Sequence, residues 1–398
     1  MAEGRKEKPN LDKAMKDISE VQESKSRSYR FKITFKNKDA QARVCQDIVG
    51  GFVHGYELDE HLRDDGVDMA GGSLIVECKT ETSPPTRLPA TFLKTGRTTA
   101  ERLYEHTLKL KGSRAIAMAY LIANCADLNK WIICYEELTG YLTDNLEGLD
   151  PFYISASEMS PYWQNQLREI ISALSDMGKQ GTHHGGMSMS KSYTLSPSRD
   201  IKLIGVMKNG DGTKTLHGDL LDLEKFLREN PIISASTGPD WRGFQLLIKS
   251  AAMLKLDTWA GDVLGYPLLL DPEERLLSYL DLHVWTDRIL LSEKREFSNA
   301  LWCLLPNYYG KKVESFITGR DKCIKIHDDD TYDGKIIYID IIKFVKNMIR
   351  HGRALFQQKL LEKINGLFPG FMSVAYAVSK FLPRDRQQLF AGCKKLPY

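Results

Sequence analysis

Apolar residues recur along the chain with two periods, and these predict its strands and helices. Alternation in residues 29–36 predicts a strand, and short apolar runs at 114–122 and 130–136 predict two buried strands. Apolar side chains three to four residues apart predict helices over 99–111 and from Pro161 onward. The first half thus mixes strands with helices, so we expect an α/β domain with a mixed sheet flanked by helices.

Helix start signals mark three places. Thr98 and Glu101 have the spacing of a capping box, Ser160 precedes Pro161, and residues 271–274 read Asp-Pro-Glu-Glu. After about residue 200 the pattern becomes mostly helical, with hairpins expected at 201–218 and 323–340. We therefore expect a mainly helical α+β C-terminal domain.

Composition divides the chain into four parts. Residues 1–28 are charged and poor in apolar side chains, which is typical of a flexible arm. Residues 178–199 begin with a small, polar, glycine-rich stretch, which predicts a linker. The expected division is an arm (1–28), an α/β domain (29–177), the linker (178–199) and a basic, mainly helical domain (200–398).

Charge and cysteine content narrow the classes of function. The chain has a net charge of +3, but residues 341–398 alone carry eleven Lys or Arg against two acids. A basic end favours a phosphate-bearing or acidic partner. Seven scattered cysteines without a Cys-x-x-Cys pair argue against a disulfide framework and a structural zinc site. With no signal-peptide pattern and no apolar stretch long enough for a bilayer, we expect an intracellular protein without a membrane partner.

Residues 66–81, GVDMAGGSLIVECKTE, hold the main candidate for catalysis. In a strand over 73–80, Leu74 and Val76 would face a core while Glu77 and Lys79 share the other face. A turn at Gly71-Gly72 would bring Asp68 beside Glu77. Two carboxylates can bind Mg²⁺ or Mn²⁺, and a lysine can orient water or stabilise charge on a phosphate in the transition state.

This stretch resembles the PD-(D/E)xK nuclease superfamily, which has the restriction-endonuclease-like fold. The order of a helix from Asp39, the hairpin, a second helix and a further strand over residues 40–135 is similar to the core of that fold. The resemblance implies Asp68 and Glu77 as metal ligands, the carbonyl of Cys78 as a further ligand, and Lys79 as the catalytic lysine. Valine, rather than proline, precedes Asp68. The alternative is an ordinary charged strand edge, which discourages aggregation.

A basic stripe near the C-terminus is the main candidate for nucleic-acid binding. Lys343, Lys346, Arg350 and Arg353 follow a helical spacing of seven residues over one face. A proline-marked loop with Arg87, Lys94 and Arg97 would add to the same phosphate-binding surface. The alternative is that the stripe is only a solvated helix face.

Two functions remain open from the sequence. The first is a metal-dependent nuclease acting on DNA or RNA, with Mg or Mn as cofactor and a C-terminal domain that grips the nucleic acid. The second is a non-enzymatic protein that coats nucleic acid, as viral nucleoproteins do. Such a protein would bind RNA in a basic cleft and form a homo-oligomer through its terminal arms. Both hypotheses predict phosphate binding, and only the first requires Asp68, Glu77 and Lys79.

Overall fold

The structure is a computed structural model. It describes residues 27–29, 51–58, 69–78, 86–125, 130–155, 158–205, 208–209, 213–229, 239–251, 256–304, 337–351, 357–368 and 370–381. Residues 1–26 of the expected arm, the predicted strand beyond Tyr29, residues 323–336 and Arg353 therefore lie outside the described residues. Residues 27 and 28, expected in the arm, belong to a strand over Arg27–Tyr29. The hairpin predicted over 323–340 is wrong in its last four residues, because a helix begins at Ile337.

The chain divides into two compact units. The first comprises residues 1–145 and 190–208, and the second comprises residues 146–189 and 209–398. The sequence places a domain boundary within residues 178–199. The chain crosses from the second unit to the first within this range, after Met189. Residues 146–177, expected in the first domain, belong to the second unit, because α4 (Pro161–Lys179) packs against later helices.

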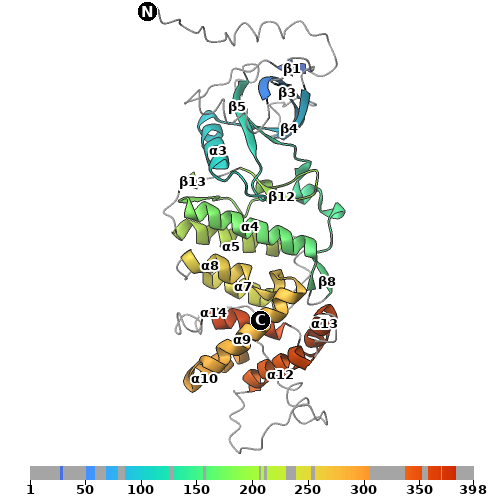
Figure 1. The fold of residues 1–398 in the computed structure, drawn as a ribbon. Coiled ribbons are helices and arrows are strands. Elements are labelled where there is room, and N and C mark those ends of the chain that lie inside the picture. The colour runs from blue at the N-terminus through green and yellow to red at the C-terminus, as the bar shows by residue number, and fades with distance from the viewer. Residues whose placement is uncertain are drawn as a thin grey trace, which may run out of the picture. The chain divides into compact units, whose positions relative to one another are not determined.

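A six-stranded sheet forms the body of the first unit (Figure 1). Its strand order is β1-β2-β3-β4-β6-β5, and every neighbouring pair is antiparallel. The strands span Arg27–Tyr29 (β1), Gly51–Leu58 (β2), Met69–Cys78 (β3), Thr86–Thr95 (β4), Ala119–Cys125 (β5) and Lys130–Glu136 (β6). The N-terminal half thus combines strands and a helix as expected, but the prediction of a mixed sheet is wrong. No parallel pair is found between the described strands of this sheet.

Alternating side chains place one face of this sheet in a core. Leu74 and Val76 of β3 are buried there, as the pattern predicted, together with Tyr56 of β2 and Ala90 and Phe92 of β4. The helix α3 (Arg97–Lys109) packs against β5 and β6. Its N-cap is Gly96, which makes no side-chain cap, so the predicted capping box at Thr98 is wrong.

The proline-marked loop predicted over residues 83–99 is a strand followed by a helix start. Pro89 lies within β4 opposite Ser73 of β3. On the other side, β6 pairs with β4 only from Ala90 onward, so β4 is at an edge there around Pro89. A proline is tolerated at such an edge because its missing N–H need not break a ladder hydrogen bond. The helix expected from Asp39 up to Gly50-Gly51 lies outside the described residues, and the residues that follow it, 51–58, form β2.

A small antiparallel sheet completes the first unit. Its order is β12-β11-β7, with strands Ile201–Leu203, Tyr193–Leu195 and Gly140–Tyr141, next to the short 3-10 helices η3 (Leu142–Asp144) and η5 (Ser190–Ser192). The hairpin predicted over 201–218 is wrong, because β12 pairs with the preceding β11 and residues from Thr213 begin helix α5. β13 (Lys208–Asn209) lies where the chain leaves this unit.

The second unit is mainly helical, as expected of the C-terminal half (Figure 1). Its helices are α4, α5 (Thr213–Glu229), α7 (Pro239–Ala251), α8 (Leu256–Leu264), α9 (Pro272–Arg288), α10 (Leu291–Leu304), α12 (Ile337–His351), α13 (Gln357–Leu367) and α14 (Phe371–Phe381). Short elements accompany them: η4 (Leu146–Gly148), β8 (Tyr153–Ser155), β9 (Glu158–Met159), β10 (Thr182–His183) and η6 (Pro267–Leu269).

Two predicted helix starts are confirmed in this unit. The hydroxyl of Ser160 accepts a hydrogen bond from the backbone N–H of Trp163, and Pro161 is the first residue of α4. Asp271 and Glu274 form a complete capping box at the start of α9. Each signal lies within four consecutive residues, so the local sequence was sufficient to predict where the helix begins.

Residues 178–192 differ from the exposed linker that their composition predicted. His184 is fully buried, and the carboxylate of Asp219 on α5 accepts hydrogen bonds from the backbone N–H groups of His184 and Gly185. Asp219 itself is buried. A charged acceptor that satisfies two backbone donors holds this glycine-rich segment against α5.

Candidate functional site

The predicted metal site depends on β3, and its geometry differs from the expected hairpin. Gly71 and Gly72 lie inside one continuous strand, where they pair with Thr91 and Ala90 of β4. The prediction of a turn at Gly71-Gly72 is therefore wrong. Glu77 and Cys78 close the strand opposite β2. Asp68 and Lys79 lie just outside the described residues.

The continuity of β3 sets a long distance between its two ends. Met69 and Glu77 are eight residues apart in an extended strand, which corresponds to about 26 Å between their Cα atoms. Two carboxylates on one Mg²⁺ must both approach to about 2 Å from the ion. The strand therefore gives no geometric support for one ion shared by Asp68 and Glu77.

The basic residues of the first unit are also spread along β4. Arg87 is exposed near the start of this strand, and Lys94 is near its end, about 23 Å away at the rise of a strand. Their positions differ by an odd number, so the two side chains leave opposite faces of the sheet. Arg97 forms an ion pair with Glu101 at 3.1 Å and lies over the ring of Trp131. These three residues do not form one phosphate-binding surface.

The basic stripe of the second unit is present on α12. Its buried face carries Tyr338, Ile341, Ile342 and Val345. Lys343 and Arg350 are exposed and Lys346 is half-buried, and at 100° per residue the three side chains fall within about 60° of each other. Within the described part of the chain, no carboxylate forms an ion pair with Lys346 or Arg350. The arrangement is a single-signed cationic face of three residues, which we call the α12 cationic face.

A histidine that the sequence did not single out lies beneath this face. His283 of α9 is 5% exposed, and its Nδ1 is 3.3 Å from a carboxylate oxygen of Asp287. The helices α9 and α12 pack against each other. Burial lowers the pKa of His283; the charge of Asp287 raises it, and the charges of Lys346, Arg350 and Lys343 lower it further. Three cations of α12 thus act on this imidazole against one carboxylate, that of Asp287.

Such a cluster attracts anions. A bound phosphate stabilises such a cluster because its negative charge offsets the repulsion between neighbouring cations. Binding of a polyphosphate also releases its counterions, which is favourable as well. No signal in the sequence pointed to His283, because its position beneath the cations depends on the packing of two helices separated by more than forty residues.

A second polar cluster lies buried among the helices of this unit. Asp240 of α7 and Arg275 of α9 are both buried and interact electrostatically. Burial raises the pKa of the Asp240 carboxyl, while a hydrogen bond with Ser373 and the charge of Arg275 lower it. The hydroxyl of Tyr266 donates to the backbone carbonyl of Asp240 at 2.5 Å. The cluster joins α7, α9 and α14 in the core, where a substrate has no access, so we assign it a structural role.

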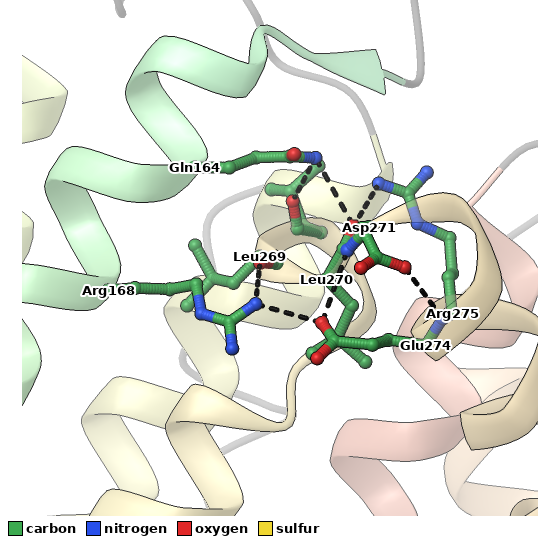
Figure 2. A network of polar contacts seen from close by, with 8 residues as sticks. Gln164, Arg168, Leu269, Leu270, Asp271, Glu274 and Arg275 are labelled. Atoms are coloured by element: carbon green, nitrogen blue, oxygen red, sulfur yellow. Dashed lines mark hydrogen bonds and ion pairs between the residues drawn. The ribbon is translucent and has the colours of Figure 1, made fainter.

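A third polar network fixes the start of α9 (Figure 2). The side chains of Gln164 and Arg168 reach from α4 to the backbone carbonyls of residues 268–270. Arg168 also forms an ion pair with Glu274, the residue that completes the capping box with Asp271. The side chain of Arg275 donates to the carbonyl of Leu270. These contacts set the position of α9, which carries His283.

Among the described residues, no group of three or more His, Cys, Asp or Glu side chains is arranged to hold a metal ion. The helices in the described part of the chain are all too short or too polar to span a bilayer. Comparison of the sequence with models of protein families and with curated proteins gave no match. The α12 cationic face is therefore the candidate site that the geometry favours.

Proposed function

We propose that the protein binds nucleic acid through the α12 cationic face and coats it without cleaving it. The observation that carries this proposal is the gathering of Lys343, Lys346 and Arg350 on one side of a helix whose other side is buried in the core. A rigid helix holds the three charges at a fixed spacing, which suits contacts with successive phosphates of a backbone.

The chemistry of this face is suited to phosphates rather than to bases. Lysine and arginine on a helix surface neutralise phosphates, whereas reading a sequence requires contacts with base edges. We therefore expect binding with little sequence preference and strong dependence on salt, on RNA and DNA alike. Such a binding mode fits a protein that covers a nucleic acid over its length.

A nuclease is the second candidate function, and it requires a different site. It depends on Asp68, Glu77 and Lys79 acting on one phosphodiester with Mg²⁺ or Mn²⁺. The turn at Gly71-Gly72 that this site was expected to use is part of the continuous strand β3 instead, which supports the non-enzymatic proposal. The resemblance to the PD-(D/E)xK superfamily stays a prediction.

The proposal is tested by binding and cleavage measured on the same substrates. Fluorescence anisotropy with labelled single-stranded RNA and DNA should show that K346Q with R350Q weakens binding roughly tenfold on both. The matched control is K225Q, which removes an exposed lysine from α5 of the same unit. With Mn²⁺ present, the labelled strands should stay intact. Divalent-dependent cleavage that is lost in E77Q would establish the nuclease instead.

A further inference from the structure

His283 is a buried titratable group on α9, the helix that packs against α12. Its Nδ1 lies 3.3 Å from a carboxylate oxygen of Asp287, whereas its Nε2 is buried and forms no hydrogen bond with a described residue. The carboxylate favours the neutral tautomer that carries its proton on Nδ1. A second proton would therefore go to Nε2, which has no acceptor among the described residues.

Three features of the fold oppose this second proton, and a ligand alters only one of them. Burial separates the imidazolium from water, and Nε2 lacks an acceptor; both belong to the packed core. The third feature is the positive charge of α12, carried by exposed or half-buried side chains that a phosphate can reach: Lys343, Lys346 and Arg350. Phosphates bound there offset the cations and leave the core as it is.

The other elements that pack against α9 do not supply the charges that act on His283. Besides α12, these elements are α13, α14 and η6. The charges that shift the pKa of His283 are that of Asp287 on α9 itself and those of the three cations of α12. They do not include the described charged residues of α13 and α14, which are Lys359, Glu362, Lys363 and Lys380. The response of this imidazole to a ligand therefore depends on the α12 cationic face.

We propose that His283 couples nucleic-acid binding to pH, so that the chain binds an anionic strand more tightly when this imidazole carries its second proton. The inference rests on the proposed function, because the strand is the ligand that offsets the cations of α12. Phosphates on the α12 cationic face stabilise the imidazolium. By reciprocity, the imidazolium raises the affinity of the face for phosphates.

The direction of the pH dependence follows from this linkage. In the free chain the pKa of His283 lies below its ordinary value of 6.5, because burial and the cations of α12 lower it. In the complex the phosphates offset these cations, so the pKa is higher than in the free chain. Affinity should therefore rise as the pH falls through the interval between the two pKa values. A coupling at the low end of the usual range corresponds to a rise of about fivefold.

Fluorescence anisotropy of the full chain with labelled oligothymidylate, from about pH 8 to about pH 5, tests the proposal. Neither the phosphodiesters nor the bases of this strand change charge in that range. Wild type should show the rise of about fivefold, and H283Q should lose it. The matched control is H351Q, because His351 is the other histidine on these two helices, at the end of α12. H351Q should keep the rise. A wild type indifferent to pH, or a rise that survives in H283Q, overturns the proposal.

A second variant keeps the buried imidazole in place. The carboxylate of Asp287 raises the pKa of His283, and this side chain is half-exposed, so D287N changes the charge with little change in packing. The rise in affinity should occur at lower pH in D287N than in wild type, because the imidazolium has lost its acid partner. A rise at the same pH in both proteins would mean that another group takes up the proton.

Proton uptake separates this coupling from the proposed function. Isothermal titration calorimetry near pH 6, in two buffers of different ionisation enthalpy, should show that wild type takes up protons on binding the strand and that H283Q takes up fewer. If K346Q/R350Q weakens binding at neutral pH while uptake is equal in wild type and H283Q, the proposed function stands and the coupling is overturned. If K346Q/R350Q binds as wild type does, the proposed function fails and the coupling fails with it.

Discussion

Lys346 of α12 lowers the pKa of His283, which is buried on the neighbouring helix α9. The charge of Arg350 acts in the same direction, whereas Asp287, one turn after His283, raises the pKa. The imidazole is thus a reporter, already present in the fold, of the electrostatic potential of the α12 cationic face.

The first prediction uses this reporter. In K346Q the pKa of His283 should rise, because one of the charges that disfavour the imidazolium is gone. Binding of a polyphosphate should raise it for the same reason. NMR titration of the histidine Cε1–H signals measures both effects, with H283Q to assign the resonance and K225Q as control. An unchanged pKa in K346Q would mean that the two helices do not pack as described.

The second prediction concerns the buried pair of Asp240 and Arg275. R275M should lower the free energy of unfolding by roughly 3 kcal/mol at pH 7, because it leaves a buried carboxylate without its cation. The folded-state pKa of Asp240 is raised, so its charge becomes more costly as pH rises through that pKa. The loss in R275M should therefore be smaller at acidic pH, where Asp240 is protonated, than at neutral pH, as urea unfolding at several pH values would show. A loss independent of pH would argue that Asp240 is neutral throughout.

A third prediction tests the junction between α4 and α9 drawn in Figure 2. D271A should lower the free energy of unfolding by about 1 kcal/mol through loss of the capping box. R168M should cost less than about 1 kcal/mol, since both partners of its ion pair are partly exposed. Urea unfolding compares these variants with K225M as control. A larger effect for R168M than for D271A would contradict this ranking.

The sequence predicted those parts of the fold that depend on neighbouring residues. Ser160 with Pro161 and Asp271 with Glu274 determine helix starts within one turn, and both are confirmed. The buried face of β3 followed from the alternation that includes Leu74 and Val76. Local patterns did not predict the structure of segments whose conformation depends on residues distant in the sequence. Pro89 is accommodated by the limited pairing of β6, and the segment of His184 is held by Asp219.

The candidate site shows the same difference between features set by neighbouring residues and features set by distant contacts. The spacing of Lys343, Lys346 and Arg350 is a local property, and a helix that displays them was predicted, although its first residues, 337–340, were expected in a hairpin. The expected metal site required Gly71-Gly72 to turn. A glycine pair permits either a turn or a strand with close neighbours, and its pairing with β4 decides in favour of a strand. His283 could not be found from the sequence, because only the packing of α9 on α12 makes it part of the site.

The fourth prediction concerns Glu77 and metal ions. A site that binds Mn²⁺ in the folded chain would raise the melting temperature by mass action, and removal of a ligand would abolish the rise. Because Gly71-Gly72 does not form the turn that was expected to bring Asp68 beside Glu77, we expect any shift with Mn²⁺ to be the same in wild type and E77Q. Differential scanning fluorimetry measures this. A rise confined to wild type would restore the metal site and favour the nuclease.

The salt dependence of binding tests the central claim most directly. Affinity for a labelled single strand should be measured over a series of salt concentrations for wild type, K346Q/R350Q and K225Q. If Lys346 and Arg350 each contact a phosphate, the slope of log affinity against log salt should flatten by about 1.4 units in the double variant and stay unchanged in K225Q. Equal slopes and equal affinities in all three proteins would contradict the account, because the α12 cationic face would then be only a solvated surface.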